Sequence, residues 1–425
     1  MNNTLYVGSV SSGWHNGAAH QGNIDVTDFD LVNQAKGRTA VLHANLELDD
    51  HDAPALWVRP DGRLVAAYAK HGSENAFYYR ISDESRSRWE PERTWTDTHN
   101  NHSRLTYANL VFLQGKNKPR GRLYNFMRGL EGELKPGYVF SDDAGESWTR
   151  GGVFIDVPNY SGMHHRPYVK IATDGQTRVH FVFTEGHPRN NNNSIHHLMY
   201  EDGYLLSTNG SRIAPLSTGI HDPASTASLV FHGDGDHVAW TSDLHLDKLG
   251  RPVGVFSVRR KNMGAKQGSA DEAPTRQGTV ADDTGTDIRY HYARWNGTTW
   301  SQHNIAHGGS GLYAKEADYS GNIALDPQEV DTVYFSTNVH PASDRRDERG
   351  RRESWRRRSC CPYQRVLRVS GGNGGGIGLG EARATPAVLS FRPTTASSTL
   401  LFHCGRHPGG WAVPGGGRAE GAVAH

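Results

Sequence analysis

The sequence predicts an all-β chain made of repeated antiparallel sheets, because strand-like patterns recur along it while helical periodicity is scarce. Short alternating or apolar runs bounded by Gly, Asp, Asn and Pro occur at 55–69, 122–129, 177–186, 237–244, 253–260 and 332–339. In the recurring unit, a polar or aromatic residue precedes a strand, an Asp/Asn-Gly turn, a second strand and a more polar outer strand. The units begin near His51, Tyr107, His164, Asp236 and Asp318, at spacings close to the length of a propeller blade. We therefore expect a β-propeller.

The sharpest marker of the repeat is the segment SDDAGESW, from Ser141 to Trp148. It fits the pattern Ser-x-Asp-x-Gly-x-Ser/Thr-Trp of the Asp-box, which is a hairpin turn. We expect Asp143 to hold backbone amides, Gly145 to adopt a positive φ, and Trp148 to pin the turn to the blade. Many propellers of unrelated function contain this turn, so it predicts the fold and not the function.

Composition and charge exclude several kinds of partner. The formal net charge is +1, with 46 basic and 45 acidic residues, so the chain has no overall field that would attract nucleic acid or an anionic membrane. No run of about 18 apolar residues predicts a transmembrane helix. The residues before the first strand-like run, at 4–10, lack the basic start and apolar core of a signal peptide. We expect a chain that stays inside the cell or lacks its export segment.

A break in composition near Ser343 divides the chain into a propeller domain, 1–342, and a tail, 343–425. The tail is rich in Arg and Gly, has no Lys, and contains all three cysteines, Cys360, Cys361 and Cys404. A disordered basic tail or a nucleic-acid-binding tail would have this composition. We prefer a frameshift that replaces the end of the propeller, because the change follows directly after the strand-like run at 332–339. The cysteines then say nothing about redox compartment or metal binding.

Polar and aromatic side chains gather at the expected blade starts and strand ends, which in a propeller converge where a ligand binds. These residues are His51, His71, Tyr107, Arg128, His165, Arg166, Tyr168, His187 and Arg189. His51 and His71 flank one strand-like run, in which Pro60-Asp61-Gly62 predicts a hairpin turn. The hairpin would bring both imidazoles to one place, together with Tyr107.

Several segments resemble the BNR-repeat family that includes the seven-bladed propeller ulvan lyases and the rhamnose–glucuronate lyases. They are DDHDAPALWVRPDGRLVAAYAKHG, TYANLVFL, RPYVKIATDG, FTEGHPR, NSIHHLMYEDG and DYSGNIALDPQEVDTVYFSTNV, and the resemblance runs from about Thr4 to His340. It implies a seven-bladed β-propeller, incomplete at the C-terminus of this chain. It also implies a secreted or periplasmic protein, although the chain shows no signal peptide.

The resemblance also implies a site. Family members use two histidines, a tyrosine and an arginine, which by motif are His51, His71, Tyr107 and Arg128 here. The residues then expected to bind substrate are Arg166, Tyr168, His187 and Arg189. The segment GKNKPRG between Tyr107 and Arg128 departs from the family pattern and looks like a short insertion.

The chemistry of such a lyase needs these side chains. To cleave a 4-linked uronate by β-elimination, an enzyme removes the proton on C5 and protonates the departing O4. Arg128 could stabilise the negative charge that develops on the carboxylate. A neutral histidine can be the base, and Tyr107 can protonate the leaving oxygen. We expect an acidic polysaccharide as the partner of a monomeric enzyme.

No catalytic metal is needed if the arginine neutralises the substrate acid. The 24 histidines leave room for a structural zinc or calcium, but the sequence does not place its ligands.

Two other functions stay open. A sialidase-like glycoside hydrolase would use carboxylates such as Asp49, Asp50 or Glu185. A non-catalytic carbohydrate-binding propeller would need no acid–base groups. Ulvan, gum arabic side chains and bacterial rhamnose–glucuronate glycans all present the same reacting sugar, so the polymer is not identified.

Overall fold

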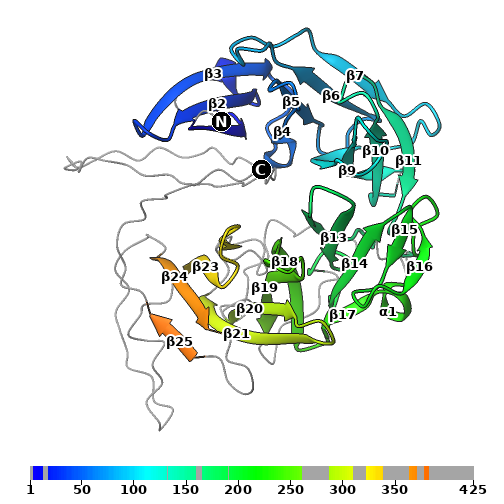
Figure 1. Cartoon of the computed structure of the whole chain (residues 1–425), viewed down its shortest axis with the longest axis vertical. Coiled ribbons are helices and arrows are strands. Elements are labelled where there is room, and N and C mark those ends of the chain that lie inside the picture. Colours follow the sequence, from blue (N-terminus) through cyan, green and yellow to red (C-terminus); the bar gives the residue numbers. More distant parts are fainter. Residues whose placement is uncertain are drawn as a thin grey trace, which may run out of the picture.

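The chain folds into antiparallel sheets that follow one another around a common centre (Figure 1). A computed structural model describes residues 3–12, 18–131, 133–158, 165–189, 191–260, 287–309 and 322–337, and the backbone of 363–370 and 378–381. Within these ranges, strands form nearly all of the regular structure, as the alternating sequence pattern predicts. None of the helices in the described part of the chain has the length and hydrophobicity needed to span a membrane.

Each sheet is built from strands that are consecutive in the chain. The first sheet contains β1 (Thr4–Val10), β2 (Ile24–Asp30) and β3 (Ala35–His43), and the second β4 (Ala55–Val58), β5 (Leu64–Tyr68), β6 (Ala76–Ile81) and β7 (Arg93–Thr96). The third contains β8 (Thr106–Leu113), β9 (Arg122–Leu130), β10 (Lys135–Ser141) and β11 (Thr149–Val153). Two short 3-10 helices, η1 (Ala18–His20) and η2 (Asp50–Asp52), precede β2 and β4.

The remaining sheets continue in the same way. The fourth contains β12 (Val169–Thr173), β13 (Arg178–Phe183), β14 (Ile195–Glu201), β15 (Tyr204–Leu206) and β16 (Arg212–Pro215), with β17 (Ser228–Phe231) paired to β14 after helix α1 (Pro223–Thr226). The fifth contains β18 (His237–Leu246), β19 (Pro252–Arg260), β20 (Ile288–Trp295) and β21 (Trp300–Gly309). The sixth contains β22 (Ile323–Leu325), β23 (Thr332–Thr337), β24 (Tyr363–Ser370) and β25 (Gly378–Glu381).

The propeller arrangement is confirmed, but the expected number of seven blades is not. Among the described residues, five sheets have four or more strands and form blades, and the sheet of β1, β2 and β3 has three strands. The sequence repeat predicts what each blade looks like, because strand patterns and turns are local. It does not determine how many blades are present, since that number depends on how the sheets pack around the centre.

The last sheet includes backbone from the segment that the sequence assigned to a tail. Strands β24 and β25 extend the sheet of β22 and β23, and β23 pairs with β24 from Thr332 opposite Arg368 to Thr337 opposite Tyr363. The rest of 343–425 lies outside the described residues, and so do the three cysteines and the blade starts expected at His164 and Asp318. The domain boundary near Ser343 stays a prediction.

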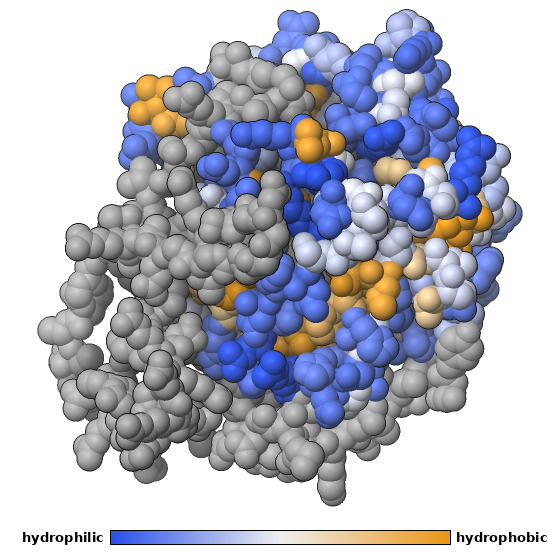
Figure 2. Space-filling view, turned by 60° about the horizontal axis from the view of Figure 1, so that its bottom comes forward, coloured by the Kyte–Doolittle hydropathy of each residue, from blue (hydrophilic) through white to orange (hydrophobic). Residues whose placement is uncertain are grey.

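The hydrophobic core lies between successive sheets. Phe126 of β9, for example, packs edge-on against Phe181 of the next sheet, with ring centroids 5.1 Å apart, and against Phe154 at 5.5 Å. Further apolar clusters join the other pairs of neighbouring sheets. On the face shown in Figure 2, the described surface is mostly hydrophilic and its hydrophobic residues form small separate groups. Burial between sheets therefore accounts for the apolar side of each strand.

The Asp-box turn between β10 and β11 forms as predicted. Asp143 Oδ1 accepts hydrogen bonds from the Ser141 hydroxyl and the Ser147 backbone amide at 2.7 and 2.9 Å. Gly145 has a φ of 91°, which a side chain would disfavour. Trp148 is buried, and its ring meets Phe77 of β6 edge-on at 5.5 Å. The tryptophan packs in a cluster with residues of its own blade and of the preceding one, so it pins the turn at the junction between them.

Ion pairs reinforce the same junction. Glu146, within the Asp-box turn, accepts from Arg59 Nη1 at 2.8 Å and from Arg93 Nη1 at 2.7 Å. Both arginines belong to the β4–β7 blade, one in the turn after β4 and the other at the start of β7. The turn thus connects two blades through apolar packing and through charge-assisted hydrogen bonds.

We expect Trp148→Ala to lower the free energy of unfolding by about 3 kcal/mol, because it removes a buried aromatic ring from the junction between blades. Trp148→Phe should lose much less, since the buried Nε1 atom of Trp148 has no hydrogen-bond partner among the described residues. Chemical denaturation followed by circular dichroism measures both. An alanine variant within about 1 kcal/mol of the parent would show that the junction does not depend on this ring.

Candidate active site

The antiparallel strands β4 and β5 bring His51 and His71 together. His51 lies in η2 before β4, and His71 follows β5. The turn between these strands has the expected hairpin bonds, since Gly62 N donates to Arg59 O at 2.9 Å. The two imidazole rings are stacked, with centroids 3.9 Å apart and planes inclined by 8°. As expected from the hairpin, the two histidines mark one place.

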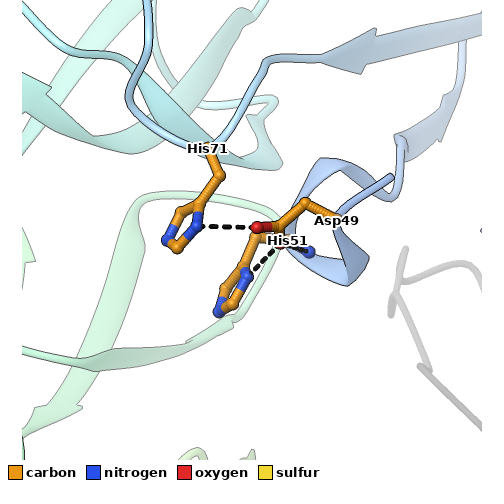
Figure 3. Close-up of side chains that lie close together, drawn as sticks. All are labelled: Asp49, His51 and His71. Carbon is orange, nitrogen blue, oxygen red and sulfur yellow. Dashed lines mark hydrogen bonds and ion pairs between the residues drawn. The ribbon is translucent and has the colours of Figure 1, made fainter. Parts of the chain in front are cut away.

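A single carboxylate orients both rings. Asp49 caps η2, and its Oδ1 atom pairs with His51 Nδ1 while Oδ2 pairs with His71 Nδ1 at 2.9 Å (Figure 3). Burial alone would raise the pKa of Asp49, but the hydrogen bonds from His51 and His71 outweigh it and hold this pKa well below its usual range. Asp49 is therefore an anion at neutral pH. In a neutral ring held this way, Nδ1 carries the proton and Nε2 has the lone pair, and both Nε2 atoms point away from Asp49.

The same three side chains are the group of described residues that comes closest to a metal site. Their ligand atoms lie within 4.8 Å of one another. However, each Nδ1 atom faces a different oxygen of Asp49, and the parallel rings direct their Nε2 lone pairs side by side. Metal coordination requires lone pairs that converge on one point. The geometry fits a pair of imidazoles that are both hydrogen-bonded to one carboxylate.

Tyr107 approaches this pair from the next blade. Its ring centroid is 5.2 Å from that of His51 and 6.3 Å from that of His71. Tyr107 has a φ of 57°, in the left-handed region that aromatic residues rarely adopt. It lies in a bulge, because the register of β8 against β9 shifts between Thr106 and Asn109. The bulge turns the tyrosine towards the histidines at the cost of backbone strain.

Arg128 lies near the end of β9, opposite Thr106, and is only 3% exposed. Its guanidinium carbon lies 4.7 Å from the ring centroid of Tyr107 and 5.1 Å from that of Tyr168. Among the described residues, its buried Nε and Nη1 atoms have no hydrogen-bond partner. Gly129 follows with a φ of 102°, and a Cβ there would stand 1.7 Å from the carbonyl oxygen of Arg104. A glycine is therefore required beside this arginine.

The residues expected to bind substrate lie in the next blade, before β12 and after β13. Tyr168 meets His187 edge-on at 5.7 Å. Burial and the charges of Arg189, Arg166 and Arg128 lower the pKa of His187 to about 3, so its ring is uncharged at neutral pH. The backbone amide of Arg189 donates to His187 Nδ1 at 3.0 Å, which places the ring proton on Nε2. All eight expected site residues therefore gather in one region. Within it, the charges of three arginines act on the uncharged ring of His187.

Lys135 of β10 also supports this group of residues, although sequence reasoning did not single it out. Its side chain is buried. Its ammonium group donates to the backbone carbonyl oxygens of Val157 and His165. These bonds tie the third blade to the residues directly before Arg166 and Tyr168.

Trp240 of β18 also belongs to this region, although it was not among the expected site residues. Its ring centroid lies 5.6 Å from that of Tyr168 and 5.1 Å from that of His187. A signal for it exists in the sequence, because Trp240 lies a few residues after the blade start expected near Asp236. The site therefore extends from the second to the fifth sheet.

A second carboxylate of η2 differs sharply from Asp49. Asp52 is fully buried, and neither of its oxygens has a hydrogen-bond partner among the described residues. Burial, followed by the charges of Glu47, Asp49 and Asp50, raises the pKa of Asp52 to about 8, and Lys70 opposes this rise. The Asp52 carboxyl group is thus protonated at neutral pH in the folded protein.

Asp52 should make folding stability depend on pH. Because its pKa is higher in the folded than in the unfolded chain, its ionisation favours unfolding progressively between about pH 4 and pH 8. We expect Asp52→Asn to gain melting temperature relative to the parent across this range, with the smallest difference near pH 4. Thermal unfolding at several pH values measures this. A difference between the two proteins that stays constant from pH 4 to pH 8 would contradict a raised pKa.

Comparisons with known proteins agree with this fold. Residues 17–308 match the BNR repeat-containing family. The chain is similar to the structure of a polysaccharide lyase, a PL25 ulvan lyase, bound to -[GlcA(1-4)Rha3S]-, with a TM-score of 0.55 and 14% identity, covering 80% of this chain and 76% of that one. A second structure of a PL25 ulvan lyase has a TM-score of 0.54, with the same identity and coverage. An α-L-arabinanase of Penicillium chrysogenum complexed with arabinobiose has a TM-score of 0.41 and 12% identity, covering 68% of this chain and 75% of that one.

At such identities the likeness to solved structures shows the fold alone. No curated protein matches the chain by sequence. The family match, in contrast, spans more than half of the chain. The chain belongs to the BNR repeat-containing family.

Proposed function

We propose that the protein is a polysaccharide lyase that cleaves a 4-linked uronic acid, glucuronate or iduronate next to rhamnose, by β-elimination. The observation that carries this proposal is Arg128, a buried cation that has no carboxylate partner among the described residues. Its guanidinium lies over the ring of Tyr107, which in turn packs against His51 and His71. An unpaired buried charge is costly unless a ligand supplies the counter-ion. A sugar carboxylate would supply it, and its charge would increase during the reaction.

The proposed reaction uses the groups around Arg128. The Nε2 atom of a histidine of the pair, His51 in our assignment, takes the proton from C5, and the electron pair of that C–H bond forms the C4=C5 double bond. The C4–O4 bond breaks, and Tyr107 gives its proton to the departing oxygen. Arg128 stabilises the charge on the carboxylate through paired donors. The proton on the histidine then returns to the tyrosine to close the cycle.

Asp49 supports this assignment as a positioning residue. By accepting from Nδ1 of both rings, it leaves the Nε2 atoms as the basic positions and stabilises an imidazolium when one forms. Stacking of the rings at 3.9 Å limits their rotation. A base held in this way loses little freedom when it meets the substrate.

The carboxylates argue against glycoside hydrolysis, which needs two such groups beside the scissile bond. Both oxygens of Asp49 pair with histidines. Glu185 accepts from His196 Nε2 at 2.7 Å and from Ser194 N at 2.9 Å. Asp50 is exposed, with its oxygen 3.3 Å from His51 Nδ1. Hydrogen bonds thus occupy Asp49 and Glu185, which leaves fewer than two of these three candidate carboxylates for hydrolysis, so we favour the lyase over the hydrolase.

Cleavage of a uronate polysaccharide should produce an unsaturated sugar, because β-elimination leaves a conjugated C4=C5 double bond that absorbs ultraviolet light. We expect His51→Ala and Tyr107→Phe to lower kcat about a hundredfold or more with little change in KM. Arg128→Lys should lower kcat and raise KM, since a point charge cannot replace the paired donors of the guanidinium. Ultraviolet assays on uronate polymers measure these values.

Matched controls separate these effects from general damage. His102→Ala changes an exposed histidine, and Arg122→Lys changes an arginine of the same strand as Arg128 that pairs with Asp142. Both should keep parental kinetics. New reducing ends without ultraviolet absorbance would instead indicate a hydrolase, and binding without cleavage would indicate a carbohydrate-binding protein. Near-normal turnover in His51→Ala and Tyr107→Phe would refute their assignment as base and acid.

We further propose that the chemistry needs no metal, and that a polymeric substrate places the enzyme outside the cytoplasm. Incubation with EDTA followed by gel filtration should leave kcat within about twofold of the untreated value, because Arg128 neutralises the substrate carboxylate. Loss of activity that Zn²⁺ or Ca²⁺ restores, with an unchanged melting temperature, would overturn this. A fall in melting temperature would point to a structural metal instead.

A further inference from the structure

Trp240 belongs to the fifth sheet, whereas the histidine pair flanks strands of the second. Tyr168 contacts both the guanidinium of Arg128, whose carbon is 5.1 Å from its ring centroid, and the ring of Trp240, with centroids 5.6 Å apart. Trp240 is partly exposed, while His187 beside it is buried. The contact between Tyr168 and Trp240 thus joins the blade of β12 to the blade of β18.

The surroundings of Trp240 hold its ring in place. Its plane is inclined by 80° to the ring of Tyr168 and by 55° to that of His187, so it packs against two neighbouring rings. The low pKa of His187 keeps that neighbour uncharged. A rigid aromatic ring with part of its surface exposed needs little reorganisation to receive a flat apolar ligand.

The C–H face of a pyranose ring is such a ligand. Its carbon-bound hydrogens form an apolar surface that stacks on an aromatic ring, while its hydroxyl groups stay at the rim and in water. If the carboxylate of a uronate pairs with the guanidinium of Arg128, the polymer would continue in one direction over Tyr168 towards Trp240. Side chains from four sheets would then bind successive sugars of one chain.

We propose that Trp240 forms a separate sugar subsite, which takes through its C–H face a pyranose of the same polysaccharide outside the reacting uronate. This inference rests on the proposed function for the position of the uronate. The subsite makes the protein bind long oligosaccharides more tightly than a disaccharide, and it contributes to binding rather than to proton transfer.

The inference is tested with 4-linked glucuronate–rhamnose oligosaccharides, a disaccharide and a hexasaccharide. Trp240→Ala should weaken hexasaccharide binding about tenfold or more, leave disaccharide binding unchanged, and leave kcat at saturation within about twofold. Trp240→Phe, which retains a ring and so preserves packing, should lose less. Calorimetry on the His51→Ala background gives the affinities without turnover, and the ultraviolet assay gives kcat.

Trp295→Phe is the matched control. In the register of the sheet, Trp240 of β18 lies opposite Ser257 of β19, and Ser257 lies opposite Tyr290 of β20. Trp295 lies five residues further along β20, at the other end of the blade. This control should bind both oligosaccharides as the parent does. Calorimetry distinguishes failure of the subsite from failure of the proposed lyase, because it does not require cleavage. A parent that binds the hexasaccharide no better than the disaccharide, or a Trp240→Phe variant that loses kcat with unchanged affinity, would overturn the subsite.

Discussion

The first two strands of each blade are antiparallel, and the positions of several residues of the candidate site follow from this constraint. A residue before the first strand and a residue after the second lie at the same end of the sheet. His51 and His71 occupy these two positions in one blade, and Tyr168 and His187 occupy them two blades later. Because the blades surround one centre, these ends face a common region (Figure 1). Residues of neighbouring blades, such as Tyr168 and Trp240, thus come into contact although they are far apart in the sequence.

Within that region, two carboxylates three positions apart have opposite electrostatic roles. Asp49 accepts from two imidazoles and is charged, whereas Asp52 is buried without a partner among the described residues and is neutral. The difference depends on hydrogen bonds and not on residue type, since both are aspartates on one short helical turn. A chemical role for an acidic residue near the site therefore has to be argued from its contacts.

Sequence reasoning reached the features that local patterns encode. Strand alternation, the Asp-box and the hairpin at residues 60–62 predicted the blades and placed His51 beside His71. The pattern could not reveal that Tyr107 has a positive φ, because this depends on the bulge formed between two paired strands. The shared role of Asp49 and the burial of Asp52 arise from packing, and Trp240 was overlooked because a tryptophan in a strand pattern usually belongs to the core. The number of blades depends on assembly around the centre.

Among the described residues, the guanidinium of Arg128 has no carboxylate partner, and this has a consequence for the unliganded protein. An interior charge without a counter-ion stores electrostatic free energy in the unliganded fold, and any anion that reaches it releases that energy. Ligand binding and folding are then thermodynamically linked, so the protein is most stable when it is occupied. Simple anions of the medium, such as sulfate and phosphate, would compete for the same charge. The group that we assign to recognising an acidic sugar therefore also makes the empty protein less stable than its packing alone would allow.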